Sequence, residues 1–316
     1  MNRLFILGNG FDVAHSLPTR YDNFRKYLLE NYPDASKRTP SFNISSSTMP
    51  DGEEVFDDDE AVSFIMHVIS NAEADANNWC DIETSLGHLD FSEFFDDISI
   101  LFGDEEDDDD FYSDDYKRRE DAASNFRMVT ETIKDYFSEW INTIDISEVA
   151  PKPKLQNLIS NGENHFINFN YTKVLEQVYN VKEVTHIHGI VNGDIILGHG
   201  VELTSNTDDE DEDYEDYDDS HFELDELHRS LKKPTEKIIR KNESFFNKLT
   251  NVNEIYSYGF SFSDVDLPYI RKIRESTDTT HVVWYLSRFG KAEEHEEYKT
   301  KIRKCGFKGT FDWFDI

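Results

Sequence analysis

The chain is poor in cysteine and has no long apolar run. Its 316 residues include only Cys80 and Cys305, too few for a four-cysteine zinc site or a disulfide framework. We therefore expect no structural zinc and a reduced, cytoplasmic setting. No stretch approaches the roughly 18 apolar residues of a membrane span. The run Leu4 to Leu7 is also too short for a signal peptide, so no membrane association is expected.

Positive charge is scarce as well. The chain has 32 Lys and Arg against 66 Asp and Glu, a formal net charge of −34. Nucleic-acid binding needs clustered Lys and Arg, so this balance disfavours a direct nucleic-acid ligand. Much of the acidity is gathered in two runs, 104–110 and 208–219. Such runs are usually solvated loops, although an inhibitory or partner-binding role is the alternative.

Short apolar segments bounded by turn residues indicate strands. They lie at 3–8, 165–169, 184–188, 194–197, 255–260 and 281–286. Helical or turn signals separate them, as βαβ units require. Hydrophobic residues make up only 37% of the chain, but 24 Phe and 15 Tyr can fill a core. We predict an α/β fold with a mostly parallel sheet flanked by helices.

A long stretch after the first predicted strand has helical periodicity and no strand signal. Its candidate helices are 60–77, 81–99 and 116–144. This pattern predicts a helical insertion rather than a separate domain. We expect a single α/β domain built from 1–25 and 151–316, with 26–150 as the insertion and 199–221 as an acidic loop.

A glycine-containing turn, Gly8-Asn9-Gly10-Phe11-Asp12, follows the first predicted strand. Glycines at such a turn let the backbone approach a diphosphate, and the helix that follows directs its N–H groups at the anion. Position 13 is Val, so the third glycine of the dinucleotide fingerprint is absent. A tight strand-to-helix corner explains the glycines equally well.

Two polar residues, Asn170 and His188, stand at the ends of consecutive predicted strands. The ligand crevice of an open α/β sheet lies at the carboxyl ends of its strands. An amide and an imidazole there can converge on one ligand. The plainer alternatives are that Asn170 or Thr172 caps the next helix, and that His188 is a satisfied core residue.

A further strand end carries Gly259, Ser261 and Asp264. Ser261 could bond a ribose or a phosphate, whereas Ser263 or Asp264 could simply cap the following helix. Metal-ligand spacing such as H-E-x-x-H is absent, so no metal site is expected.

The segment WCDIE (79–83) lies where two predicted helices meet. Trp79 and Glu83 are candidates to line the pocket from the insertion. The plainer reading makes Asp81 the N-cap of a helix.

Together these motifs resemble the AbiH family of bacteriophage abortive-infection proteins. The resemblance rests on LFILGNGFDVAHSLPTRYDNF (4–24), WCDIE (79–83), FINFNYTKVLEQVY (166–179), HIHG (186–189), the ILG at 196–198 and YGFSFSDVD (258–266). It covers most of the chain in order. It implies a role in anti-phage defence.

The same motifs are similar to the sirtuin-type, or SIR2-like, NAD-binding fold, which is Rossmann-like. That resemblance implies that His188 and Asn170 are catalytic and that NAD is the substrate or ligand. It implies nucleotide contacts from Gly8, Asn9, Gly10, Phe11, Asp12, Gly259, Ser261 and Asp264. Asp12 replaces a usual serine, Thr172 replaces an aspartate, and the zinc cysteines are missing, so protein deacylation is not expected.

The leading hypothesis is an NAD+ hydrolase that cleaves the nicotinamide–ribose bond during abortive infection. The alternative is a non-catalytic sensor of NAD or ADP-ribose, or a partner-binding subunit of a defence system. A nuclease using carboxylates with Mg²⁺ comes third, because no ordered acidic motif at strand ends supports it. By analogy with abortive effectors we also expect a homo-oligomer and a phage-derived trigger or partner defence protein.

Overall fold

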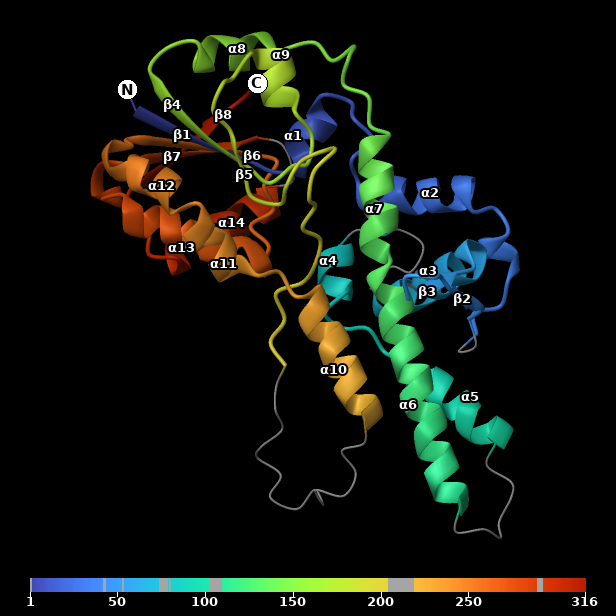
Figure 1. Cartoon of the computed structure of the whole chain (residues 1–316). Coiled ribbons are helices and arrows are strands. Elements are labelled where there is room, and N and C mark those ends of the chain that lie inside the picture. The colour runs from blue at the N-terminus through green and yellow to red at the C-terminus, as the bar shows by residue number, and fades with distance from the viewer. Residues whose placement is uncertain are drawn as a thin grey trace, which may run out of the picture. The chain divides into compact units, whose positions relative to one another are not determined.

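The computed structural model describes residues 2–41, 44–52, 54–73, 79, 81–102, 110–203, 219–288 and 292–316 (Figure 1). The acidic runs, except Asp110 and Asp219, lie outside these residues, as does Cys80. The chain divides into two compact units. The sheet unit comprises Met1–Arg20, Ser138–Ile196 and Lys233–Ile316, and the helical unit comprises Tyr21–Phe137 and Leu197–Lys232. The domain boundaries expected from the sequence stay predictions.

The sheet unit is built on six parallel strands (Figure 1). They are β1 (Asn2–Leu7), β4 (Glu163–Asn168), β5 (Thr185–His186), β6 (Glu254–Tyr258), β7 (Val283–Ser287) and β8 (Thr310–Phe314). Their spatial order is β5-β4-β1-β6-β7-β8. Numbered by chain order within the sheet this is 3-2-1-4-5-6, the doubly wound order of dinucleotide-binding sheets. The predicted α/β class with a parallel, Rossmann-like sheet is confirmed.

Helices cover both faces of this sheet. One face packs against α11 (Thr235–Lys241), α12 (Glu243–Phe246), α13 (Leu267–Ser276) and α14 (Ala292–Lys304). The other packs against α1 (Asn9–Ala14), α8 (Pro153–Ile159) and α9 (Val174–Tyr179). Successive residues of a strand point to opposite faces. Leu4 and Ile6 therefore join the first core, while Phe5 and Leu7 join the second, and β1 reads as a continuous apolar run.

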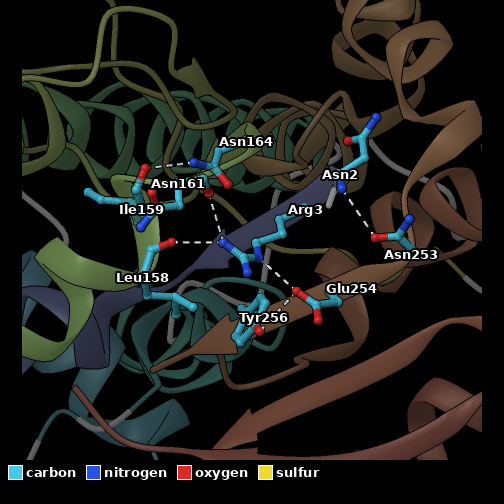
Figure 2. Close-up of polar contacts among 9 residues, drawn as sticks. All are labelled: Asn2, Arg3, Leu158, Ile159, Asn161, Asn164, Asn253, Glu254 and Tyr256. Carbon is cyan, nitrogen blue, oxygen red and sulfur yellow. Dashed lines mark hydrogen bonds and ion pairs between the residues drawn. The ribbon is translucent and has the colours of Figure 1, made fainter.

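Arg3 connects β1 to neighbouring elements at the edge of the sheet where the strands begin (Figure 2). Its Nε atom lies 2.7 Å from Oε2 of Glu254 on the neighbouring strand. Its Nη1 donates to the carbonyl oxygens of Leu158 at 2.9 Å and Asn161 at 2.8 Å. These contacts tie β1, β6 and the end of α8 together at the edge opposite the strand ends that carry the candidate site.

The helical unit contains α2 (Tyr21–Asn31), α3 (Asp58–Ala72), α4 (Ile82–Ser85), α5 (Ser92–Phe102), α6 (Asp110–Glu131) and α10 (Asp219–Leu231). It also holds the hairpin β2 (Ser46–Thr48) and β3 (Glu54–Phe56) and the start of α7 (Ile133–Asn142). A short 3-10 turn at Ala35–Lys37 also belongs to this unit, whereas those at Asn247–Asn251, Asp264–Asp266 and Thr279–His281 belong to the sheet unit. Phe126 stacks with Phe64 and Phe91 at ring-centroid distances of 5.3 and 5.5 Å, which places an aromatic core between α3, α5 and α6.

The sequence-based prediction of a strand at 194–197 is wrong. Residues 194–197 form only an isolated bridge, between Ile195 and Gly189. The backbone there folds back on the segment after β5, and the Ile196 N–H donates to the His188 carbonyl at 2.8 Å. Within the described residues, every helix is too short or too polar to cross a bilayer.

Candidate functional site

Four neighbouring strands end at the same level of the sheet. Leu7 is in register with Asn168 and with Tyr258, and Asn168 is in register with His186. The sequence-predicted site segments follow these strand ends directly. The structure therefore gathers them at the carboxyl edge, beside the switch point between β1 and β6, where doubly wound sheets bind ligands.

The glycines of this edge pack two turns against each other. The N–H of Gly8 donates to the Tyr258 carbonyl at 3.1 Å, and that of Gly10 to the Gly259 carbonyl at 2.9 Å. A Cβ on Gly8 would lie 2.6 Å from the Gly259 oxygen, and one on Gly259 2.3 Å from Gly10 Cα. Close approach of the turns is thus a sufficient reason for these glycines. Their contact with a diphosphate stays a prediction.

Asn170 bridges the loop after β4 to the glycine turn. Its side chain is buried, and Nδ2 donates to the Gly8 carbonyl at 3.0 Å. Its N–H donates to Oδ1 of Asn168 at 3.1 Å. The N-cap of α9 is Lys173, so the helix-cap alternative for Asn170 and Thr172 is wrong. One bond therefore holds the side-chain amide and the other holds the backbone of the same residue, and such positioning is what a substrate-orienting group requires.

Asp12 and Thr172 form a buried hydrogen-bonded pair. Thr172 Oγ1 donates to Asp12 Oδ2 at 2.7 Å, and both residues are at most 3% exposed. Burial raises the pKa of Asp12 to about 7, against a smaller lowering by the Thr172 bond. Asp12 Oδ1 is buried and has no hydrogen-bond partner among the residues described. The two positions that depart from the sirtuin pattern therefore bond each other.

His188 lies in a buried cluster of opposite charges. Its Nε2 atom is 3.3 Å from Asp266 Oδ1 and 3.2 Å from Lys233 Nζ. All three residues are at most 5% exposed. Burial alone would raise the pKa of Asp266, but the charge of Lys233 and the contacts with His188 and Ser263 outweigh it and lower the pKa to about 2. Phe169 and Tyr171, on either side of Asn170, pack on the imidazole ring.

Because Nε2 of His188 faces both an acidic and a basic side chain, the tautomer of the ring decides which of its nitrogens is basic. A neutral imidazole has one donor and one acceptor nitrogen. With its proton on Nε2 the ring donates to Asp266, and Nδ1 is the basic nitrogen. With its proton on Nδ1 the ring accepts from Lys233 at Nε2. Lys233 makes a hydrogen bond to Nε2 at 3.2 Å, which is the arrangement with the proton on Nδ1. Asp266 Oδ1 lies 3.3 Å from Nε2 as an ion-pair contact and has no hydrogen-bond partner among the described residues, so the arrangement with the proton on Nε2 requires Lys233 to release that nitrogen.

Sequence reasoning missed Lys233 and Asp266. Asp266 stands just before α13, where an acidic residue reads as an ordinary helix start. Lys233 reads as part of the basic stretch 232–241. Nothing in the local pattern marks either residue as a partner of His188, because their meeting depends on the folded chain.

The other predicted site residues are less enclosed or lie elsewhere. Asn9 is exposed and donates from Nδ2 to the Thr19 carbonyl at 2.7 Å, while Phe11 is buried. Ser261 is exposed. Asp264 is exposed and lies 3.8 Å from Lys301 Nζ.

Trp79 and Glu83 belong to the helical unit, where both are buried. Trp79 donates from Nε1 to Ser70 Oγ at 3.2 Å. Asp81 caps α4 by accepting from the Thr84 N–H at 3.2 Å, which confirms the plainer reading of that residue. A pocket-lining role for Trp79 and Glu83 stays a prediction.

The comparisons with known proteins gave one match. The sequence model of a family described as bacteriophage abortive infection AbiH matches residues 4–288. That range includes every candidate residue of the carboxyl edge. No match was found among curated proteins or among solved structures. In the described residues, no group of three or more His, Cys, Asp or Glu is placed to hold a metal ion.

Proposed function

The chain belongs to the AbiH family of bacteriophage abortive-infection proteins, and from that premise we propose that its sheet unit hydrolyses NAD+. The family places the protein in anti-phage defence. The observation that carries the finer proposal is the buried cluster of His188, Asp266 and Lys233. Phe169 and Tyr171, the neighbours of Asn170 in the chain, contact the His188 ring, and both segments follow strand ends of a 3-2-1-4-5-6 sheet. A perturbed ionisable cluster in such a place is typical of a catalytic site.

The proposed reaction replaces the nicotinamide by water at ribose C1′. The bond from C1′ to the ring nitrogen breaks, its electron pair leaves with nicotinamide, and a water oxygen bonds to C1′. The products are nicotinamide, ADP-ribose and one proton. An oxocarbenium-like state lies between, as in glycoside hydrolysis, and nicotinamide leaves without a strong acid.

His188 acts as the general base in this scheme. With its Nε2 proton donated to Asp266, Nδ1 takes the proton from the attacking water or a ribose hydroxyl. Proton transfer of this kind typically contributes ~10²–10⁴-fold to the rate. Asn170 orients the ribose and the water, and Lys233 offsets the charge of Asp266.

Asp12 fits a nucleotide better than its usual charge would suggest. A carboxylate repels a diphosphate, but a carboxyl with a pKa of about 7 is protonated in a large fraction of molecules at neutral pH. We assign its Oδ1, which has no hydrogen-bond partner among the described residues, to a ribose hydroxyl. We assign the neighbouring turn Gly8–Phe11 and Gly259 to the diphosphate side, and the exposed Ser261 and Asp264 to the adenosine side.

The test is NAD loss over time with purified protein, with and without phage lysate. Wild-type protein is compared with His188→Ala and Asn170→Ala, and the exposed His281→Ala is the matched control. We expect loss with wild type and His281→Ala, and a rate at least ~10²-fold lower for His188→Ala. Full turnover by a folded His188→Ala protein would refute the assignment.

A nucleotide sensor is the second candidate, and the position of Lys233 favours it. If Lys233 donates to Nε2 at 3.2 Å, Nδ1 carries the proton and His188 is a donor rather than a base. Such a ring binds a nucleotide oxygen without turnover. Calorimetry with NAD and ADP-ribose separates the two: binding without NAD loss in any condition favours the sensor.

A further inference from the structure

The helical unit contains a cavity that the proposed reaction does not use. Its volume is about 500 Å³, within the range of small-ligand sites. Its walls come from α5, α10, the segment 86–91, Arg119 of α6 and Leu203, all in the helical unit. The apolar part of the lining is formed by Leu86, Leu89, Phe91, Leu224, Leu227 and Leu231.

The charges of the lining indicate the class of ligand. Three carboxylates, Asp90, Asp96 and Asp225, face one guanidinium, Arg119. Asp225 is also paired with Arg229 at 3.2 Å, whereas Asp90 and Asp96 are exposed. Two serines and two histidines also line the cavity, so the lining is mixed, with an apolar part and a negative excess. It suits a molecule with an apolar body and one positively charged group.

The first link from this cavity to the site is α10 itself. Leu227, His228 and Leu231 of α10 line the cavity. Two residues after Leu231 the chain enters the sheet unit at Lys233. The Nζ atom of that lysine is 3.2 Å from His188 Nε2. The helix that lines the cavity and the lysine beside the imidazole are therefore separated by a single residue of the chain.

The second link runs through His228 to the other connection between the units. The ring of His228 contacts the Val201 carbonyl at 3.1 Å and lies against the ring of His199 at a centroid distance of 4.2 Å, with the two planes tilted by 53°. From His199 the chain leads back to Ile196 in the sheet unit. The Ile196 N–H donates to the carbonyl of His188 at 2.8 Å.

The two links are joined to each other before they enter the sheet unit. The N–H of His199 donates to the Leu231 carbonyl at 3.0 Å, and His199 forms a parallel bridge with Lys232. The two segments are therefore hydrogen-bonded to each other. One ends at the ring of His188 and the other at its backbone.

We propose that this cavity is a regulatory site for a small amphipathic cation, whose binding shifts the tautomer of His188 through residues 196–199 and 231–233. An occupant that draws Lys233 away from Nε2 favours the proton at that nitrogen and leaves Nδ1 as the base. The proposal that the cavity binds a cation does not depend on the function of His188. The regulatory half rests on the proposed function of His188.

The experiment is NMR of protein with ¹⁵N- and ¹³C-labelled histidine, because histidines report both ends of the path. His221 and His228 line the cavity, His188 reports the site, and the exposed His281 is the reference. The probes are 4-phenylbutylamine and its anionic counterpart 4-phenylbutanoate. We expect the amine to shift His221, His228 and His188 but not His281. The carboxylate should bind about two- to fivefold more weakly, as for one exposed charge contact.

Cavity-filling variants supply the control. Leu224→Trp places an indole in the cavity, and Phe222→Trp, on the same helix but exposed and outside the lining, is its matched partner. Leu203→Trp, at an exposed loop position of the lining, serves if the helix variant does not fold. The amine response should be lost in the filled variants and retained in Phe222→Trp.

Each outcome decides one half of the proposal. No shift of His221 or His228 with the amine overturns the cation site, and equal binding of the carboxylate overturns its charge preference. Shifts of His221 and His228 without His188 overturn the link. None of these readouts requires NAD loss, so a failed proposal here is distinguishable from a failed hydrolase assignment.

Discussion

Asp12 is a buried carboxyl whose protonation contributes to the pH dependence of the stability of the sheet unit. Burial, the largest cause, raises its pKa from 3.8 to about 7. The folded chain therefore binds a proton that the unfolded chain releases between these values. The stabilisation is complete below the unfolded pKa and is lost as pH rises through about 7. The slope is at most ~1.4 kcal/mol per pH unit for one proton.

We predict that Asp12→Asn removes this slope from the free energy of unfolding between about pH 4 and pH 7. Chemical denaturation at a series of pH values measures it, with the exposed Asp264→Asn as control. Thr172→Val deletes the hydrogen bond that lowers the pKa of Asp12, so it should move the loss of stability to higher pH. An unchanged slope in Asp12→Asn would contradict the assignment.

At the scale of single residues, only part of the candidate site could be predicted from the sequence. Asn170 and His188 follow from a local rule, since a polar residue after a buried parallel strand must stand at the carboxyl edge. Lys233 lies 45 residues from His188 along the chain. Asp266 becomes its partner only when α13 packs on the sheet. Long-range charge pairing of this kind leaves no periodic trace in a sequence.

The turns after β1 and β6 pack so closely at Gly8 and Gly259 that there is no room for a side chain at either residue. We predict that Gly8→Ala and Gly259→Ala each cost about 1–3 kcal/mol of unfolding free energy, as overpacking typically does. Gly259 also has φ of +60°, so its variant should be the worse. Gly193→Ala, whose nearest contacts are at 3.3 Å, is the matched control. Thermal unfolding of the three variants checks the order, and a wild-type Tm for Gly8→Ala would contradict it.

How well each strand could be predicted from the sequence depends on how much of it is buried. β1 is buried on both faces, so its apolar run was predictable. The edge strand β8 (Thr310–Phe314) has no fully buried residue and gave no such signal. The helical pattern at 81–99 is broken into α4 and α5, where Gly87 packs on Val201. The segment 194–197 looked like a strand because its apolar residues pack without pairing in the sheet.

At the scale of the whole molecule, the excess of negative charge sets the response to salt. Salt weakens surface ion pairs, which contribute little each, and it also screens repulsion between like charges. The 66 Asp and Glu outnumber the 32 Lys and Arg by 34. Repulsion destabilises the compact state, and with this excess of carboxylates we expect it to outweigh the pairs.

We therefore predict that raising NaCl from about 0.02 M to about 0.5 M, which shortens the screening length several-fold, raises Tm. An increase in stability of about 1 kcal/mol corresponds to roughly 2–4 °C for a chain of this order of size. Choline chloride at the same ionic strength is the control, because screening depends on ionic strength whereas a bound sodium ion does not. A rise with NaCl alone would indicate cation binding instead. A fall in Tm with both salts would mean that attractive pairs dominate, and that the acidic excess lies too far apart to repel.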